Sequence, residues 1–479
     1  MRPPLAAALA DAARERPDAD ALLCGRERFT YAALASRVGA AAAWLAARGV
    51  RAGDRVLLRA DSRRPGFALG YFACHHLGAI AVPVEAAASR ATLDAVTQAV
   101  APRLRAAEKE LEELERAEGE APPMHDAALD DPADVLHTGG TTGGPKGVVQ
   151  THRNILAFAR GRNAAVGCAP GDRLVLPVPL SHGYGLGRLR AAVLAGSAVI
   201  LVDGFAFPAD VIGALEDQAG TSLCGVPSGF ASLLAAFGDE LSAQRGRLRY
   251  AESATAPLPA AVRDRLLALL PATRLYNSYG MTETCSSIAF VELGAAPGKR
   301  SSVGKPVAGA QLRIVDGRRR PLPPGRSGRV QIRGESVMPG YWNDAARTRR
   351  ALSGGWLSAN DLGRLDEDGY LYLEGRPEEL INVGGLKVAP AEIEEALSAH
   401  PAVAECACAG APDPAGLAGE AVTAYLVLKP GAGAAPDDRE LSRFLAARLE
   451  AYKVPSRFVW LAALPRTRLG KLRRSSLKG

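Results

Sequence analysis

The chain has 479 residues, of which 48% are hydrophobic and 23% are charged. This length corresponds to about three domain equivalents of ~150 residues each, and the composition excludes a disordered, collagen-like or coiled-coil protein. The net charge of +7 is mild for this length, and with only 5% aromatic residues it does not favour a nucleic-acid-binding protein.

The N-terminal 20 residues carry acidic residues within their apolar stretch and lack the hydrophobic region of a signal peptide. No run in the chain reaches the roughly 18 apolar residues of a membrane span. The seven cysteines form no C-x-x-C pair, and Cys406 and Cys408 lie two apart on one face of a predicted strand. We therefore expect a reduced, cytoplasmic protein without a membrane partner.

Helices and strands are expected to alternate along the first 280 residues. The apolar periodicity predicts helices over 32–48 and 67–76, and short strands over 56–58 and 79–83. Residues 108–118 predict a charged helix on the surface. This alternation is typical of stacked α/β layers with largely parallel sheets.

From about Gly309 the pattern changes to β. Residues 311–315 and 328–333 alternate like half-buried strands, and a break follows at 374–378. The last hundred residues predict helices over 391–399 and 438–449 and a strand over 421–428. The expected fold is therefore α/β: a large N-terminal domain of stacked α/β sheets with a β-rich subdomain, and a small C-terminal α+β domain.

Glycines and threonines crowd the segment from Thr138 to Gly147. Such a loop presents backbone N–H groups and hydroxyls together, which suits a polyphosphate. It is not a P-loop, because Pro145 precedes Lys146 and no serine or threonine follows the lysine. The predicted phosphate-binding residues are Thr138, Gly139, Gly140, Thr141, Thr142, Gly143 and Lys146.

This segment resembles the phosphate loop of the AMP-forming adenylating enzymes, a superfamily that includes acyl-CoA synthetases, peptide-synthetase adenylation domains and firefly luciferase. Residues 276–284, YNSYGMTET, are similar to the adenine and magnesium segment of that family. The resemblance implies that Thr282 contacts phosphate and that Glu283 offers the hard oxygen that Mg²⁺ prefers. The nucleotide-binding residues that it implies here are Asn277, Ser278, Tyr279, Gly280 and Thr282.

Two later segments resemble the family's ribose site. Residues 356–363 match the segment whose aspartate accepts hydrogen bonds from both ribose hydroxyls, which implies this role for Asp361. The usual Thr-Gly before that aspartate is replaced by Ala359 and Asn360. The pair at 375–376 matches a Gly-Arg whose arginine, here Arg376, reaches the ribose and phosphate region.

The break in the chain takes its meaning from the same resemblance. Glu378 occupies the hinge position, and Gly384, Gly385 and Lys387 resemble the segment that lines the thiol tunnel after the small domain rotates. Lys471 matches the catalytic lysine of adenylation, which bridges the carboxylate and the α-phosphate. We expect an N-terminal adenylate-forming domain at 1–374, a hinge at 375–378 and a mobile C-terminal domain at 379–479.

The substrate pocket is expected around the start of the helix that follows Ser181. A histidine at the position of His182 helps to gate the carboxylate site in the family, and the stretch 182–187 has no acid, which disfavours an α-amino acid. The mixture of small and aromatic residues suits an aryl or short-to-medium acyl carboxylate. The expected pocket residues are His182, Tyr184, Gly185, Ser228, Phe230, Ser253, Ala254, Thr255 and Ser278.

The sequence also permits three other interpretations, each of which is disfavoured. Residues 173–203 imitate a dinucleotide-binding unit of an NAD-dependent oxidoreductase, but Arg188 stands where the third glycine of G-x-G-x-x-G belongs. A serine hydrolase is disfavoured because the chain has no G-x-S-x-G elbow. A non-catalytic nucleotide-binding scaffold is disfavoured by the presence of Lys471, Glu283 and Asp361.

The expected function is an ATP- and Mg²⁺-dependent acid–thiol ligase of the acyl-CoA synthetase type. The catalytic residues that the resemblance implies are Lys471, Glu283, Thr282, Lys146 and His182. The thiol is free CoA or the phosphopantetheine of a separate acyl or peptidyl carrier protein, because no carrier domain is fused. In the second case the enzyme would be a stand-alone adenylation enzyme that loads an acyl, aryl or amino acid.

Overall fold

The computed structural model describes residues 4–62, 64–138, 146–383, 386–412, 420–466 and 472–477, with the side chains of Lys387 and Ser475 left aside. Of the predicted site residues, Gly139, Gly140, Thr141, Thr142, Gly143, Gly384, Gly385 and Lys471 lie outside these ranges. Within the described ranges, none of the helices combines the length and the apolar character that a membrane crossing requires.

The first sheet has the strand order β5-β3-β4-β6-β7. Its first four strands run parallel, and β7 pairs antiparallel with β6. The predicted helices over 32–48 and 67–76 are confirmed as α2 (Tyr31–Ala47) and α3 (Gly66–Leu77), of which α3 is buried over most of its length. The strands are β3 (Arg55–Ala60), β4 (Ile80–Glu85), β5 (Leu104–Ala106), β6 (Pro132–Thr138) and β7 (Lys146–Thr151), with α4 (Arg90–Val100) between β4 and β5.

The predicted charged helix is confirmed as α5 (Glu108–Glu115). Leu111 and Leu114 are buried, while Glu112 and Glu115 form ion pairs with Arg64. The helix therefore packs on α2 and α3 through a narrow apolar stripe, while Glu108 and Lys109 stay exposed.

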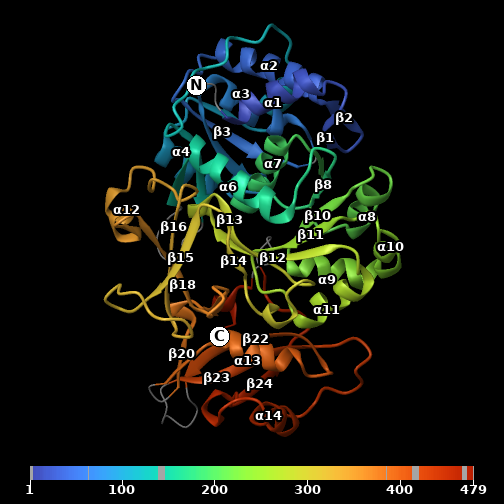
Figure 1. Ribbon diagram of the computed structural model, residues 1–479, viewed down its shortest axis with the longest axis vertical. Helices are drawn as coiled ribbons and strands as arrows, with labels where there is room; N and C mark the ends of the chain where they lie inside the picture. The colour runs from blue at the N-terminus through green and yellow to red at the C-terminus, as the bar shows by residue number, and fades with distance from the viewer. Residues whose placement is uncertain are drawn as a thin grey trace.

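The second sheet has the order β14-β13-β12-β11-β10-β8-β9-β1-β2 and occupies the middle of the molecule (Figure 1). Its central strands from β12 to β1 run parallel, as the alternation of helices and strands predicted. Their carboxyl ends therefore meet at one edge, where ligands bind in open α/β sheets. The strands are β1 (Asp20–Cys24), β2 (Glu27–Thr30), β8 (Arg173–Leu176), β9 (Ala198–Leu201), β10 (Ser222–Gly225), β11 (Tyr250–Ser253), β12 (Arg274–Met281), β13 (Ser286–Glu292) and β14 (Lys305–Pro306).

Helices cover this sheet on both faces, and α7 (Gly183–Ala195) lies between the two sheets (Figure 1). Eleven residues of α7 are buried, including two arginines, so the helix is enclosed on all sides rather than amphipathic. The remaining helices of this layer are α1 (Pro4–Glu15), α6 (His152–Val166), α8 (Pro208–Glu216), α9 (Pro227–Ala236), α10 (Gly238–Ala243) and α11 (Ala260–Leu269).

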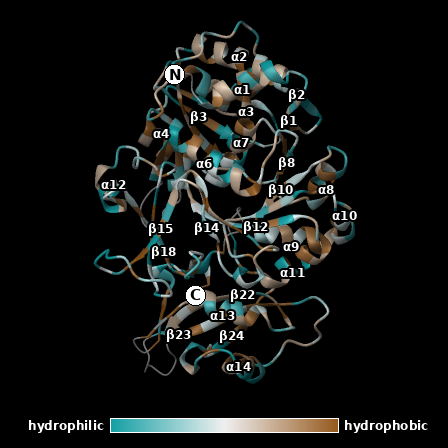
Figure 2. Cartoon of the chain, in the orientation of Figure 1, coloured by the Kyte–Doolittle hydropathy of each residue, from teal (hydrophilic) through white to brown (hydrophobic). Residues whose placement is uncertain are grey.

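The predicted change to β after Gly309 is confirmed by an antiparallel sheet with the order β15-β16-β18-β17, to which β19 adds by pairing with β18. Hydrophobic residues follow the inner strands of the sheets, whereas α12 at the periphery is hydrophilic (Figure 2). These elements are β15 (Ala310–Val315), β16 (Gly328–Gly334), α12 (Ala345–Ala351), β17 (Leu352–Ser353), β18 (Trp356–Leu365) and β19 (Leu371–Gly375).

The smaller C-terminal domain lies at one end of the molecule (Figure 1). Its helices α13 and α14 pack their apolar residues on a sheet in which β22 and β23 are antiparallel and β23 and β24 are parallel. Cys408 is buried in this core, as its position on the strand predicted. The elements are β20 (Ile381–Val383), β21 (Leu386–Val388), α13 (Pro390–Ser398), β22 (Val403–Pro412), β23 (Glu420–Leu428), α14 (Asp438–Ala446) and β24 (Arg457–Trp460).

Candidate active site

The turn between β12 and β13 carries Thr282 and Glu283 in a single 3-10 turn, η1 (Thr282–Thr284). The strands approach so closely that a Cβ on Gly280 would collide with the backbone carbonyl of Ser286. The hydroxyl of Thr284 accepts from the N–H of Met281 at 3.1 Å and donates to Ser286 O at 2.7 Å. The turn is therefore held by its own side chain and by a glycine that no larger residue could replace.

Glu283 is 8% exposed and lies within reach of one cation and one hydroxyl. Lys146, the first residue of β7, places Nζ 3.1 Å from Glu283 Oε1. Tyr341 donates its hydroxyl to the same oxygen at 2.8 Å, and burial together with the charge of Glu283 raises the pKa of this tyrosine. The structure thus brings together the predicted phosphate lysine and the predicted metal carboxylate.

Tyr341 has no counterpart among the residues predicted from the sequence. It reaches the site because the segment 340–342 adds to the free edge of β7, with the N–H of Val149 bonded to Gly340 O and that of Trp342 bonded to Gly147 O. A β-bridge joins Val148 to Tyr341. The two paired segments are almost 200 residues apart in the sequence, and no local sequence pattern predicts their pairing.

Asp361 and Arg376 also meet, as the two ribose segments predicted. Arg376 Nε lies 3.4 Å from Asp361 Oδ1, and Tyr279 donates its hydroxyl to Asp361 Oδ2 at 2.6 Å. Tyr279 is 8% exposed, and its ring packs in an apolar cluster with Val148 and Ile288. Its phenol therefore touches the predicted ribose carboxylate directly.

Further predicted nucleotide residues lie on the same strands. Asn277 is buried and donates to Ser302 O at 3.4 Å. Thr138 ends β6, and its hydroxyl, like both ring nitrogens of the adjacent His137, has no hydrogen-bond partner among the described residues. Burial lowers the pKa of His137 to about 4, so the imidazole is neutral. These unpartnered polar atoms border the segment 139–145.

The predicted hinge residue Glu378 lies in the 3-10 turn η3 (Pro377–Glu379) that follows β19. It accepts a hydrogen bond of 2.7 Å from Asn360 Nδ2, the side chain that precedes Asp361. Lys387 lies in β21.

The residues predicted to form the substrate pocket gather at the carboxyl edge of the large sheet. Some of their hydroxyl groups are bonded to Glu252, and others have no partner within the part of the chain that the structure describes. Tyr184 donates its hydroxyl to Glu252 O at 3.0 Å, and Ser278 donates to Glu252 Oε1 at 3.0 Å. The hydroxyls of Ser253 and Thr255 are buried without a partner among the described residues. Thr255 has φ of +78°, an uncommon conformation for a β-branched residue that marks local strain.

The other pocket residues are placed as follows. His182 precedes the first turn of α7, and a Cβ on Gly183 would lie 3.5 Å from Thr282 Oγ1, so the helix begins against the β12–β13 turn. A Cβ on Gly185 would collide with Pro179 O. Phe230 and Ala254 are buried in the apolar clusters.

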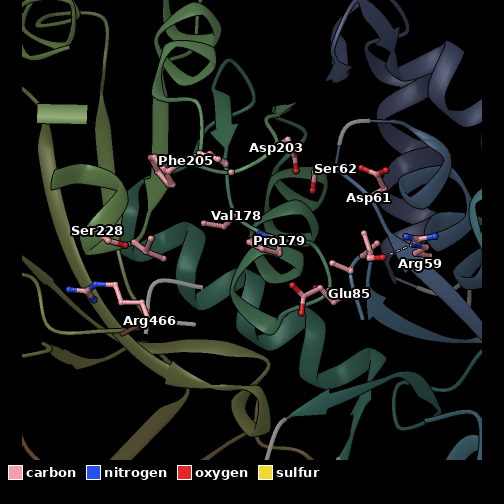
Figure 3. A pocket seen from close by; sticks show the side chains of 18 residues that line it. Arg59, Asp61, Ser62, Glu85, Val178, Pro179, Asp203, Phe205, Ser228 and Arg466 are labelled. Carbon is pink, nitrogen blue, oxygen red and sulfur yellow. Dashed lines mark hydrogen bonds between the residues drawn. The ribbon is translucent and has the colours of Figure 1, made fainter. Parts of the chain in front are cut away.

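A cavity of about 580 Å³ opens at this edge (Figure 3). Acidic residues at the carboxyl ends of strands from both sheets border it: Asp61 after β3 and Glu85 at the end of β4 in the first sheet, and Asp203 two residues after β9 in the second. Ser228 and the ring of Phe205 lie on the opposite wall, and Arg466 reaches the cavity from the C-terminal domain (Figure 3). Of the predicted pocket residues, Ser228 lines this cavity.

The sequence interpretation missed the acidic wall, although the signal was available. Polar residues placed directly after apolar strands of a parallel sheet converge at one edge. Asp61 fits that rule in the first sheet and Asp203 fits it in the second, but Asp61 lies in no recognised motif and Asp203 entered only as the end of the segment that imitates a dinucleotide-binding unit.

Comparisons with known proteins show the family to which the chain belongs. The model of the AMP-binding enzyme family matches residues 9–342, and the model of the AMP-binding enzyme C-terminal domain matches residues 392–471. A feruloyl-CoA synthase from an Amycolatopsis species is 32% identical, covering 97% of this chain and 96% of that protein. A fatty acid–[acyl-carrier-protein] ligase from Streptomyces coeruleorubidus is 31% identical, covering 97% and 94%.

A similar solved structure is the o-succinylbenzoate CoA synthetase from Bacillus subtilis in complex with the acyl-adenylate intermediate. It has a TM-score of 0.86 and 30% sequence identity, covering 98% of each chain. The same protein in complex with ATP and magnesium ion gives a TM-score of 0.85.

Proposed function

The chain belongs to the family of AMP-binding enzymes, and from this premise we propose which of its residues carry the reaction of an AMP-forming acid–thiol ligase. Such an enzyme uses ATP, Mg²⁺ and CoA. A carboxylate attacks the α-phosphate of ATP, which gives an acyl-adenylate and pyrophosphate, and a thiol then displaces AMP to form a thioester. The family assignment decides against the dinucleotide-binding and serine-hydrolase interpretations.

The observation that carries the proposal is the pair of charged clusters on the β12–β13 hairpin. Lys146 and Glu283 meet at its turn, and Asp361 and Arg376 meet beside Tyr279 on the strand before it. A cation with a carboxylate suits a metal–triphosphate, and a second carboxylate suits the two hydroxyls of a ribose. Tyr279 and Glu283 are four residues apart on one hairpin, so we assign both clusters to a single nucleotide.

The residues at the turn fit Mg²⁺. Among the described residues no group of three or more His, Cys, Asp or Glu side chains could hold a metal by itself. Magnesium ions at such sites take one or two carboxylates and complete their shell with phosphate oxygens and water. Glu283 would hold the ion, which supplies positive charge against the phosphates when bound.

The chain's own groups then have separate tasks. Lys146 leaves Glu283 for the phosphates, and Thr282 donates its hydroxyl to a phosphate oxygen. Asp361 accepts from the ribose hydroxyls, while Arg376 stays beside it. Lys471, outside the described residues, would hold the reacting oxygens of the carboxylate and the α-phosphate.

We place the acyl group of the substrate in the cavity of Figure 3. Its walls combine apolar residues such as Val178 and Phe205 with polar ones such as Ser228, which suits an aryl or short-to-medium acyl carboxylate. The segment 182–187 has no acid, but Asp61 and Asp203 bring carboxylates to the same cavity. An acid that also carries an amino group is therefore the second class to test.

We propose CoA as the thiol, with a carrier protein as the alternative. Feruloyl-CoA synthase, similar over nearly the whole chain, supports CoA, and the similar acyl-carrier-protein ligase supports the alternative. In either case the thiol step would follow a rotation of residues 379–479 about the hinge 375–378. Glu378→Pro is then expected to retain adenylation and lose thioester formation.

The test is an ATP–pyrophosphate exchange panel over aryl, fatty, dicarboxylic and amino acids, followed by CoA and carrier proteins as thiol acceptors. We expect exchange with at least one aryl or short acyl acid, and a loss of roughly a hundredfold in Lys471→Ala. Exchange that is absent for every acid, or that survives unchanged in Lys471→Ala, would contradict the proposal.

A further inference from the structure

A buried polar chain runs from the core to the backbone of the catalytic turn. Gln150 in β7 donates from Nε2 to the carbonyl of Thr282 at 2.8 Å. Its Oε1 accepts from Arg190 Nη1 of α7 at 2.7 Å, and Arg190 Nη2 lies 2.8 Å from Asp134 Oδ2 in β6. Gln150, Arg190 and Asp134 are 0% exposed.

The chemistry of the partners fixes the orientation of the Gln150 amide. Arginine has only donors, so the side chain of Gln150 must present its oxygen to Arg190. The NH₂ group must then face the Thr282 carbonyl, which can only accept. If the amide were flipped, its NH₂ group would face the donors of Arg190 and its oxygen would face the carbonyl oxygen of Thr282. Both contacts would be repulsive in a buried site, which costs free energy. Gln150 therefore has a single orientation.

Arg190 is held as firmly on its far side. Tyr71 of α3 accepts from Arg190 Nε at 2.7 Å and donates to Asp134 Oδ2 at 3.1 Å. Burial alone would raise the pKa of Asp134, but the charge of Arg190 together with the contacts from His75 and Tyr71 outweighs burial and keeps that pKa below its ordinary value. The ion pair is thus charged and anchored to two strands and two helices of the core.

Two side chains on one face of β7 contact the Thr282–Glu283 turn. Side chains at alternate positions of a strand share a face, so Lys146, Val148 and Gln150 point the same way. Lys146 contacts the side chain of Glu283, and Gln150 bonds the backbone of the residue before it. The turn contains Cys285 at φ of +61°, a conformation that non-glycine residues adopt only when the surroundings hold it.

We propose that Gln150 is a positioning residue. It ties the Thr282–Glu283 turn to the buried Arg190–Asp134 ion pair and so fixes the direction of the Glu283 carboxylate. This inference rests on the proposed role of Glu283 toward Mg²⁺ and the nucleotide. Residues that orient a metal ligand typically change metal affinity or activity by roughly 10–100-fold when they are replaced.

The experiment compares Gln150→Met with Tyr71→Phe. Both remove hydrogen bonds from Arg190 in the same buried network, but only Gln150→Met releases the Thr282 carbonyl. Calorimetry measures the affinity for α,β-methylene-ATP, which this reaction cannot cleave, as a function of Mg²⁺ concentration, and thermal unfolding measures stability. Gln150→Glu is the second variant, because it keeps an acceptor for Arg190 and loses the donor to Thr282.

We expect both Gln150 variants to weaken Mg²⁺-dependent nucleotide binding by about tenfold or more, while Tyr71→Phe lowers the unfolding temperature and leaves that binding unchanged. Equal binding losses in Gln150→Met and Tyr71→Phe, or none in either Gln150 variant, would overturn the inference. Glu283→Gln distinguishes a failure of the proposed role of Glu283 from a failure of the proposed role of Gln150. If it retains normal Mg²⁺ dependence, the proposed role of Glu283 fails and Gln150 has nothing to position.

Discussion

Two glutamates near the β12–β13 hairpin are both nearly inaccessible and both paired with cations, yet their environments differ. Glu252 of β11 contacts Arg188 Nε at 3.0 Å, Arg162 Nη2 at 3.2 Å and the hydroxyl of Ser278 at 3.0 Å. Glu283 contacts one lysine and one tyrosine. Burial and ion pairing therefore do not by themselves distinguish a carboxylate that stabilises the core from one that binds a ligand.

The partners make the difference. Arg162 and Arg188 are 0% exposed and hold Glu252 with planar guanidinium donors that are shut off from solvent. Lys146 has a flexible side chain that is 28% exposed, so it can turn to another anion. A carboxylate whose cation can leave is available to a ligand, whereas a carboxylate between two buried guanidinium groups is committed to the fold.

The largest expected effect is the loss of stability in Glu252→Gln. It leaves two buried arginines without their anion, and breaking a buried ion pair in this way costs about 3–5 kcal/mol. Urea denaturation measures the free energy of unfolding. Glu118→Gln, at an exposed position, is the control and should change it by less than about 0.5 kcal/mol. A small effect in Glu252→Gln would remove the distinction between the two glutamates.

Glu283→Gln should show the opposite signature. We expect pyrophosphate exchange to fall on the order of a hundredfold, with the free energy of unfolding within ~1 kcal/mol of the wild type, because Lys146 can reach water. Exchange kinetics and urea denaturation of the same preparation measure both. A stability loss as large as that of Glu252→Gln would show that Glu283 also belongs to the core.

Asp361→Asn tests the second charged cluster. Replacing a carboxylate that accepts from two hydroxyls removes charge-assisted hydrogen bonds worth about 1.5 kcal/mol or more, which corresponds to about tenfold in the KM for ATP. Steady-state kinetics at saturating acid measure it. Tyr279→Phe keeps the carboxylate and should change KM less; if its effect is the larger, the phenol rather than Asp361 dominates nucleotide binding.

The smallest effect concerns a buried group that stays neutral. Burial, with a smaller contribution from His75, lowers the pKa of His152 from 6.5 to about 4. The unfolded chain takes up a proton below about pH 6.5 and the native protein does not until about pH 4. The free energy of unfolding therefore decreases as the pH falls through this window, by at most ~1.4 kcal/mol per pH unit.

His152→Phe should reduce that dependence by about 1 kcal/mol between pH 6 and pH 5, as measured by urea denaturation at each pH. Part of the dependence should persist in the variant, because burial lowers the pKa of His137 in the same direction. An unchanged slope would mean that His152 is not protonated differently in the two states.

The sequence predicted most elements of the fold because their signals are local: apolar periodicity for α2 and α3, and alternation for β15 and β16. It also predicted that Asp361 and Arg376 share a site, since family motifs encode that proximity. Tyr341 and Gln150 could not be found this way. Their roles depend on β7 contacting residues more than 130 positions away, and neither residue type is unusual in its segment.

Polar residue type was also a weak guide to the acyl pocket. Tyr184 and Ser278 looked suitable for a substrate, and in the structure their hydroxyls bond to Glu252. A buried glutamate between arginines needs hydroxyl donors as much as a ligand does. Contact of these two residues with the acid stays a prediction.

The pairing of both edges of β7 has a consequence for local opening. Because β6 bonds one edge and the segment 340–342 bonds the other, the strand that leaves the phosphate segment is not a sheet edge. The amide hydrogen of Val149, which bonds to Gly340 O, can exchange with solvent only when the β-rich subdomain separates from the first sheet. Hydrogen exchange at Val149 therefore monitors the contact between two parts of the chain, and a nucleotide that bridges Lys146 and Asp361 should slow it without touching that amide.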